Sequence, residues 1–171
     1  MKTGAEAVAI PHPRSRANDF VTLAKPRLNL LVVGSSLVGY VMGGGEISDA
    51  ARVLCTVAGT ALVAGGASAF NQVIEREPDG LMRRTKRRPV PDGRLQPGES
   101  LVFAAAMSIA GLAVLAAGVN LLSAVVAFAT LVTYAAIYTP LKRRSSFATV
   151  VGAVPGALPP VIGWAAASDQ L

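Results

Sequence analysis

The stretch VLCTVAGTALVAGGASAFNQVI, residues 53–74, contains no charged side chain over 22 residues. At a rise of roughly 1.5 Å per residue, about 20 helical residues cross the hydrocarbon core of a bilayer. The chain has four further uncharged runs of similar length. None of the five runs has the polar face that a long helix of a soluble protein would show. The sequence therefore predicts an all-α membrane protein with about five transmembrane helices. The other uncharged runs are Leu28–Gly45, Leu101–Val119, Leu121–Thr139 and Phe147–Ala167.

The distribution of charge predicts the orientation of these helices. The chain has 171 residues, is 52% hydrophobic and 15% charged, and has a formal net charge of +6. Fifteen of its sixteen Lys and Arg residues lie in the N-terminal segment or in the loops after the second and fourth predicted helices, and only Arg52 lies on the opposite side. Short cytoplasmic loops carry such an excess. We expect a cytoplasmic N-terminus in a plasma or inner membrane, and this bias explains the basic composition without nucleic-acid binding.

Composition also predicts how the chain is divided into a tail and a transmembrane domain. Residues 1–18 are predicted to be a disordered tail, and residues 19–171 a single transmembrane domain. The first apolar run is longer than the apolar part of a signal peptide and starts late, so we expect no cleaved leader. The single cysteine, Cys55, excludes an internal disulfide and is interpreted as a small apolar packing residue. Gly39 and Gly43 have the spacing that lets helices approach closely in lipid, and Gly118–Asn120 predicts a tight hairpin.

Polar side chains follow the apolar run at 53–74 with a helical spacing. Asn71, Glu75 and Asp79 are four residues apart, and side chains at that spacing share one face of a helix. Mg²⁺ in proteins is typically bound by one or two carboxylates together with substrate phosphates. These three residues are therefore our predicted catalytic and metal-binding residues. The alternative is that both carboxylates merely pair with nearby arginines at a solvated helix end.

The segment that follows is the longest loop in the chain. Arg76–Glu99 is charged and rich in Pro and Gly, which is typical of a lid or a binding segment. Pro78 is expected to kink or end the preceding helix. Anchoring to anionic lipid would explain a basic run such as Arg83–Arg88. Its position directly after the carboxylates favours phosphate binding instead. The sequence thus predicts a hydrophobic diphosphate substrate whose head group lies at this loop.

These residues resemble the motifs of the UbiA superfamily of intramembrane prenyltransferases, and within it those of the branch that farnesylates heme. The superfamily motif Asn-x-x-x-Asp-x-x-x-Asp corresponds to Asn71, Glu75 and Asp79. The heme branch continues as Asp-x-x-Met-x-Arg-Thr-x-x-Arg-Pro, which matches residues 79–89. Further matches are Lys-Pro-Arg at 25–27, Tyr-Thr-Pro-Leu-Lys-Arg at 138–143, and the Gly- and Pro-rich block at 152–164.

The resemblance implies the N-terminal part of a bundle of about nine helices that transfers a farnesyl group from farnesyl diphosphate to a vinyl group of heme b, giving heme O. It implies Mg²⁺ as the cofactor that assists loss of diphosphate, held by the three motif residues. It implies farnesyl diphosphate, heme b and the lipid bilayer as partners, with association with heme–copper oxidase assembly as a further expectation. The diphosphate-binding residues that it implies are Arg84 and Arg88, then Lys142 and Arg143, then Lys25 and Arg27.

The chain also departs from the family pattern. Glu75 stands where Asp is commoner, which lengthens the arm but keeps an oxygen ligand. Ala148 stands where the family often has Asn. The family has a second acidic motif in its latter half, so we expect the 171 residues that end at Leu171 to be inactive alone, either as a fragment of a longer reading frame or as a degenerate half.

Two alternatives to heme farnesylation stay open. One is a related prenyltransferase that acts on a quinone or chlorophyll precursor. The other is a non-enzymatic membrane protein, such as half of a transporter whose basic loop only anchors it. The residues Met82–Thr85 and the block at 152–164 favour the heme branch.

Overall fold

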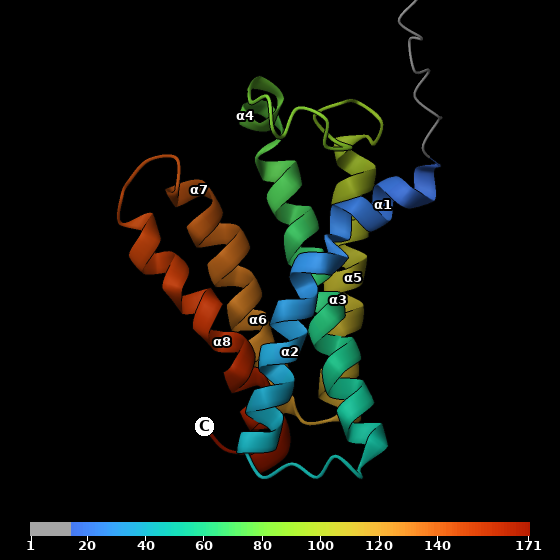
Figure 1. Cartoon of the computed structure of the whole chain (residues 1–171), viewed down its shortest axis with the longest axis vertical. Helices are drawn as coiled ribbons and strands as arrows, with labels where there is room; N and C mark the ends of the chain where they lie inside the picture. Colours follow the sequence, from blue (N-terminus) through green and yellow to red (C-terminus); the bar gives the residue numbers. More distant parts are fainter. Residues whose placement is uncertain (1–14) are drawn as a thin grey trace, which may run out of the picture.

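The structure is a computed structural model and describes residues 15–171. All regular elements within this range are helical (Figure 1), and the order of the long ones in the chain agrees with the predicted order. The elements are α1 Arg16–Ala24, α2 Pro26–Met42, α3 Ala50–Ile74, α4 Arg76–Leu81, α5 Pro97–Gly118, α6 Leu121–Val132, η1 Thr133–Tyr138, α7 Thr139–Leu141 and α8 Ala148–Ser168.

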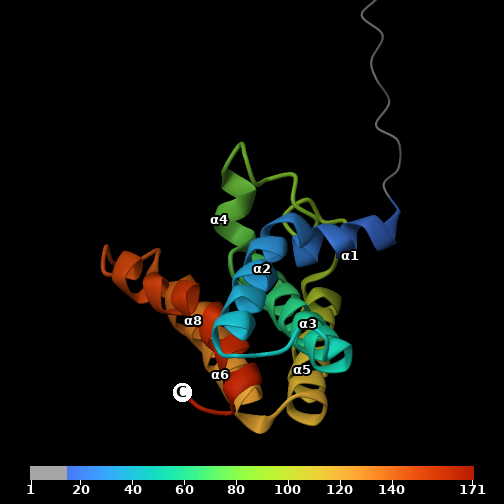
Figure 2. The ribbon, with the colours of Figure 1, turned by 60° about the horizontal axis from the view of Figure 1, so that its bottom comes forward.

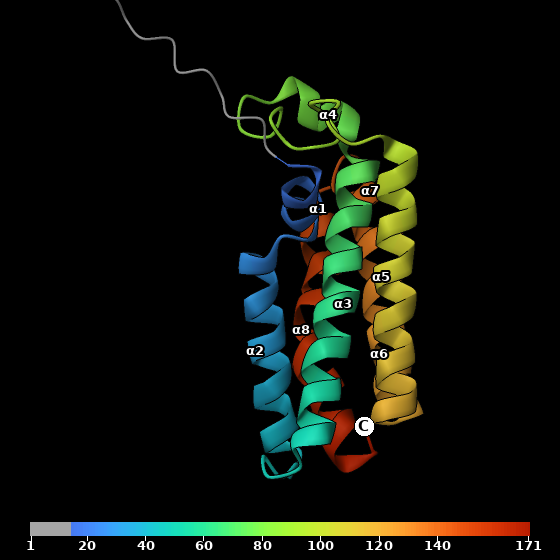
Figure 3. The ribbon, with the colours of Figure 1, turned by 90° about the vertical axis from the view of Figure 1, so that its right-hand side faces the viewer.

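Four helical segments are long and apolar enough to cross a membrane: α3, α5, α8 and the continuous rod Leu121–Leu141 that α6, η1 and α7 form. The remaining predicted span, α2, has 17 residues, at about the lower limit for crossing a bilayer, and it runs alongside the others (Figure 3). Large apolar side chains such as Leu31, Ile109 and Val150 are exposed on the outside of the bundle. The chain is therefore an all-helical, multi-pass membrane protein.

Two short helices were not expected. Residues 1–14 of the predicted tail lie outside the described residues, but Arg16–Asn18 belong to α1, so the tail prediction is wrong for them. Ser15 caps this helix by accepting a hydrogen bond from the backbone N–H of Asn18, and Arg16 forms an ion pair with Glu99 on α5. The second short helix, α4, occupies the start of the predicted loop.

Small residues bring the helices together, as the spacing of Gly39 and Gly43 predicted. A Cβ atom on Gly39 would overlap the backbone of Pro160 on α8, and one on Gly163 would overlap the backbone of Ser36 on α2. The same close approach joins α3 and α5, where a Cβ on Gly111 would lie 2.7 Å from the carbonyl oxygen of Gly59. As Figure 2 shows, α2 lies between α3 and α8.

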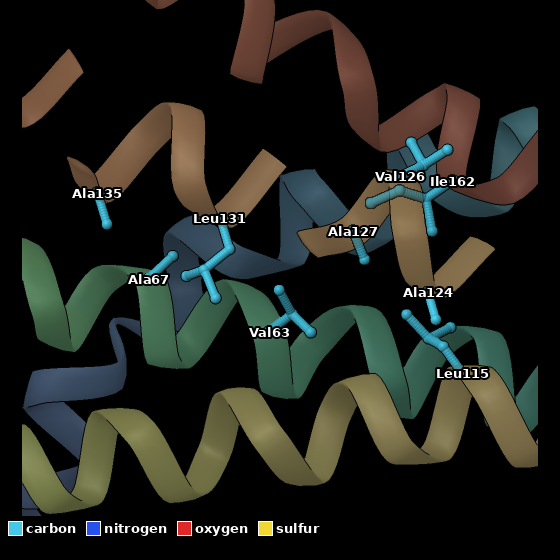
Figure 4. Close-up of a cluster of buried hydrophobic side chains, with 9 residues drawn as sticks. All are labelled: Val63, Ala67, Leu115, Ala124, Val126, Ala127, Leu131, Ala135 and Ile162. Atoms are coloured by element: carbon cyan, nitrogen blue, oxygen red, sulfur yellow. The ribbon is translucent and has the colours of Figure 1, made fainter. Parts of the chain in front are cut away.

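The core is apolar and built mainly from small side chains. One buried cluster joins α3, α5, α6, η1 and α8 (Figure 4) and consists of Val63, Ala67, Leu115, Ala124, Val126, Ala127, Leu131, Ala135 and Ile162. The hairpin predicted at Gly118–Asn120 is confirmed, since Asn120 caps α6 by accepting from the backbone N–H of Ser123 at 2.8 Å. Cys55 is a free thiol packed where α5 ends, because a Cβ on Gly118 would lie 2.6 Å from its Sγ.

One end of the bundle collects the charged segments. Figure 1 shows α1, α4 and α7 at the same end, opposite the chain terminus marked C. We call this the basic end, and define it as α1, residues 75–96 and residues 138–147. The rod Leu121–Leu141 and α8 spread away from α2 and α3 toward this end.

Candidate functional site

Glu75 lies at a break in the helix. The predicted kink was assigned to Pro78, but α3 ends at Ile74, Glu75 has φ −94° and ψ 7°, and α4 restarts at Arg76. Pro78 lies in the first turn of α4, where a missing N–H does no harm because such groups have no partner within the helix. The break is small: the N–H of Glu75 still donates to Asn71 O at 3.0 Å. The N–H of Asp79 likewise donates to Glu75 O at 2.9 Å.

The Glu75 carboxylate is held on both oxygens. Asn71 Nδ2 donates to Glu75 Oε2 at 2.9 Å, and Lys142 Nζ lies 2.5 Å from Glu75 Oε1. Glu75 and Asn71 are only 7% and 3% exposed, so neither faces lipid or bulk water. The structure thus brings together the two motif residues with Lys142, which comes from the loop after the rod Leu121–Leu141.

Asp79 is held by the loop that follows it. Arg88 forms an ion pair with Asp79 through Nη1 and Oδ2, and the hydroxyl of Thr85 donates to the Asp79 carbonyl oxygen at 2.9 Å. Asp79 is 3% exposed. Both carboxylates are thus paired with cations, but they are buried and not at a solvated helix end as the alternative had it. Glu77, in contrast, is exposed and paired with Arg76.

The loop is fixed to the first helix. Arg94 forms an ion pair with Asp19 on α1, and Asp19 is 3% exposed. Arg94 Nη2 also donates to the Arg87 carbonyl oxygen at 2.7 Å. These contacts attach residues 82–96 to α1. They also hold Arg88 beside the carboxylates instead of leaving it in solvent.

Lys25 lies at the junction of α1 and α2. It has the left-handed φ of 51°, which is uncommon for a side-chain-bearing residue. Two buried side chains stabilise this turn: Gln72 Nε2 donates to Leu23 O at 2.7 Å, and Asn29 Nδ2 donates to Ala24 O at 2.6 Å. Burial, together with the nearby Arg88 guanidinium, lowers the pKa of Lys25, and the carboxylates of Asp79 and Glu75 oppose this shift. The ammonium group is therefore part of the same charge cluster.

A cavity of about 330 Å³ is lined by Lys25 of this cluster. Its walls come from α2, α3, the rod Leu121–Leu141 and α8, and Lys25 is at its rim. The lining is mainly apolar, with Pro155 and Pro159 of α8 on one side and Tyr134 and Tyr138 of η1 on another. Ligand pockets of proteins commonly measure about 300–1,000 Å³ and combine apolar walls with a few polar groups. The arrangement fits a ligand with a charged head and an apolar chain.

The other predicted phosphate-binding residues lie outside this cluster. Arg84, Arg143 and Arg27 are exposed, and the ion pairs at the carboxylates involve Arg88 and Lys142 instead. The side chain that sequence reasoning gave no role is Thr139, whose hydroxyl lies 3.1 Å from Asn71 Oδ1. Its place directly after Tyr138 and before Pro140 gave no signal of this contact.

The donor set can be compared with what Mg²⁺ requires. Within residues 15–171 there is no group of three or more His, Cys, Asp or Glu side chains that could hold a metal ion. Glu75 and Asp79 supply two carboxylates, both hard donors, whereas the Asn71 amide turns its NH₂ toward Glu75 and its oxygen toward Thr139. Mg²⁺ uses one or two carboxylates and completes its shell with water and phosphate oxygens. These residues therefore fit a magnesium–diphosphate group better than a metal bound by protein alone.

Comparison with known proteins agrees with this geometry. The protoheme IX farnesyltransferase of Solibacter usitatus is 48% identical over 162 residues, covering 90% of this chain and 56% of that protein. The protein of the same name from an Anaeromyxobacter species is 47% identical over 167 residues, covering 98% of this chain and 56% of that protein. The mitochondrial one of Arabidopsis thaliana is 43% identical over 150 residues. The chain spans about half the length of the two bacterial relatives.

A solved structure shows the same fold. It comes from work on digeranylgeranylglyceryl phosphate synthase in membranes, and it superposes with a TM-score of 0.75 over 86% of this chain and 52% of that one. At 18% identity the likeness concerns the fold alone. Residues 32–171 match the UbiA prenyltransferase family. This match covers most of the helical bundle, including the Asn71–Asp79 motif, and it shows that the chain belongs to the UbiA prenyltransferase family.

Proposed function

We propose that the protein to which this chain belongs transfers a farnesyl group from farnesyl diphosphate to a vinyl group of heme b, which gives heme O. The observation that carries the proposal is the cluster of Glu75, Asp79, Lys142 and Arg88, whose charges act on Lys25, a residue that lines an apolar cavity. The names of the relatives, protoheme IX farnesyltransferases at 43–48% identity, support farnesyl as the group and heme as the acceptor.

The residues of this chain have separable tasks in such a reaction. Lys25, Arg88 and Lys142 present cations at the rim of the cavity, where they would bind diphosphate oxygens and stabilise the charge that develops on the leaving group. Glu75 and Asp79 would hold Mg²⁺, which supplies further neutralisation of that charge when bound. The apolar walls would hold the farnesyl chain and keep water from the allylic cation until the vinyl carbon captures it. Water would then add to the carbocation left on the former vinyl group and lose a proton, which completes the hydroxyethylfarnesyl group of heme O.

The location of the protein is part of the proposal. The basic end carries the residues of the charge cluster and the Arg-rich loop, and basic loops favour the cytoplasmic side. We infer a plasma or inner membrane with the N-terminus in the cytoplasm and the carboxylate site at the cytoplasmic surface. Heme b, farnesyl diphosphate and the bilayer are its proposed partners, and association with heme–copper oxidase assembly stays a prediction.

The test uses the full reading frame that contains this chain, expressed in cells that make heme b but lack heme O. Heme O in the extracted pigment is the expected result, and a prenylated aromatic acid without heme O would instead identify an enzyme of quinone synthesis. Mg²⁺-dependent binding of farnesyl diphosphate to the purified protein separates both enzymes from a transporter. Glu75→Gln should remove binding and product, while the control Glu77→Gln, at an exposed position two residues away, should keep both.

A further inference from the structure

A chain of hydrogen bonds links the rod Leu121–Leu141 to the carboxylate site. Thr139 Oγ1 lies 3.1 Å from Asn71 Oδ1, and Asn71 Nδ2 lies 2.9 Å from Glu75 Oε2. Thr139 is fully buried, with 0% of its surface exposed, and Asn71 and Glu75 are 3% and 7% exposed. Buried polar groups of this kind depend on one another, because no water replaces a partner that is lost.

The chemistry of the amide group decides the direction of these bonds. A carboxylate only accepts hydrogen bonds, so the Asn71 NH₂ must face Glu75 and its carbonyl oxygen must face away. That oxygen then needs a donor, and the Thr139 hydroxyl is at the right distance. The same hydroxyl also donates to the Tyr134 carbonyl oxygen at 2.8 Å, which accepts the backbone N–H of Thr139 with its other lone pair. The single hydroxyl proton is therefore shared between Tyr134 O and Asn71 Oδ1, and the Asn71 contact is the longer of the two.

The wide turn η1 explains why Thr139 faces α3. Residues Thr133–Tyr138 form a π-helix, in which each turn holds about one residue more than an α-helix. One extra residue rotates everything that follows by about 100° around the helix axis. Thr139 and Lys142 both follow η1, and both contact residues of the Asn71–Glu75 pair. π-turns inside α-helices are frequent at functional sites.

We propose that Thr139 is a positioning residue for the metal–diphosphate site: its hydroxyl fixes the amide of Asn71, and the amide in turn fixes Glu75 Oε2. Without the hydroxyl, the Asn71 oxygen loses this donor and the amide is held at the Glu75 end only, so both the amide and Glu75 Oε2 gain freedom to move away from the bound ion. The inference rests on the proposed function, since it concerns the group that Glu75 holds. Residues that orient metal ligands in this way typically change metal affinity about 10–100-fold when they are replaced.

The test measures binding instead of turnover. The full-length protein in detergent is titrated with Mn²⁺ in the presence of inorganic pyrophosphate, and bound Mn²⁺ is read by electron paramagnetic resonance. Thr139→Val should weaken Mn²⁺ binding at least about tenfold, and Thr139→Ser, which keeps the hydroxyl, should restore it. The control is Thr56→Val, which removes a hydroxyl equally buried in α3 but bonded to Arg52 O, near the other end of that helix.

A double variant separates positioning from packing. In the Asn71→Ala background the hydroxyl has no amide to orient, so adding Thr139→Val should cost no more than about twofold in Mn²⁺ affinity. Full additivity of the two effects would overturn the proposal, as would equal losses for Thr139→Val and Thr139→Ser, or a Thr139→Val variant that binds like the wild type. If the wild type itself binds no Mn²⁺ with pyrophosphate, the proposed function fails and this inference fails with it.

Discussion

Lys142 Nζ lies 2.5 Å from Glu75 Oε1, so the cation that follows one basic-end helix neutralises the carboxylate that ends another. The Glu75 side chain is 9% exposed and that of Lys142 is 31% exposed. A diphosphate entering the cluster can therefore meet Lys142 from the solvent side, while Glu75 remains behind it.

Replacing Lys142 should weaken diphosphate binding. Lys142→Met removes the cation that both Glu75 and an incoming phosphate would contact, and we expect affinity for pyrophosphate to fall about tenfold, which corresponds to about 1.4 kcal/mol. Isothermal titration of the purified protein with Mg²⁺–pyrophosphate measures this. The control is the adjacent Arg143→Met, an exposed cation, which should change affinity less than about twofold. Equal losses for the two variants would show that only the total charge of this loop matters.

A second pair of variants tests the two arginines of the motif after Asp79. Arg88 is paired with Asp79, whereas Arg84 is exposed. Arg88→Gln leaves a buried carboxylate without its cation, so we expect a lower melting temperature and about tenfold weaker pyrophosphate binding. Arg84→Gln should leave the melting temperature unchanged. A thermal unfolding scan and the same titration report both effects, and a larger loss for Arg84→Gln would place the phosphate on the outer face of the loop.

The pKa of Lys25 predicts how diphosphate binding depends on pH. Burial and Arg88 lower this pKa below the ordinary value of 10.5, so the unfolded chain binds more protons than the folded one between the two values. The free energy of unfolding should therefore rise with pH across that window. Pyrophosphate affinity should fall over the same window, because the neutral amine no longer attracts the anion.

Lys25→Arg provides the control for this pH dependence. Arginine stays charged throughout, with a pKa above about 12, so the decline in pyrophosphate affinity at alkaline pH should disappear in the variant. Titrations at several pH values between about 7 and about 10.5 cover the window. Coincident profiles for the variant and the wild type would assign the decline to another group.

The size of the cavity should set the length of the prenyl chain. Gly156 lines it, and a Cβ on this residue would meet no atom within 4 Å, so a larger side chain enters the empty space without a clash. Gly156→Leu should favour geranyl over farnesyl diphosphate in competition binding. Gly34→Leu is the matched control, since both glycines are exposed and a Cβ on either meets nothing within 4 Å, but Gly34 on α2 lies outside the cavity lining. An unchanged preference in Gly156→Leu would place the prenyl chain elsewhere.

Local spacing predicted much of the site. Asn71 and Glu75 are one helical turn apart, and they converge because the hydrogen bonds of consecutive turns fix that geometry whatever packs around them. The sequence did not predict that the helix breaks at Glu75. Proline is the usual signal of a helix break, but Pro78 lies in the first turn of α4 and is accommodated there. The helix α1 was missed as well, since its stability depends on contacts with Glu99 and Arg94, both far away in the chain.

The sequence by itself determined that long apolar helices cross a bilayer, that the charge collects at one end, and that Asn71 and Glu75 lie at the end of one of the helices. Each of these depends on neighbours a few residues apart. Only the tertiary structure decided which cations reach the carboxylates, where the cavity lies, and that Thr139 contacts Asn71 across 68 residues of sequence. The reason is physical: these contacts require the packing of α2, α3, α8 and a π-turn, and no local pattern encodes how separate helices rotate against one another.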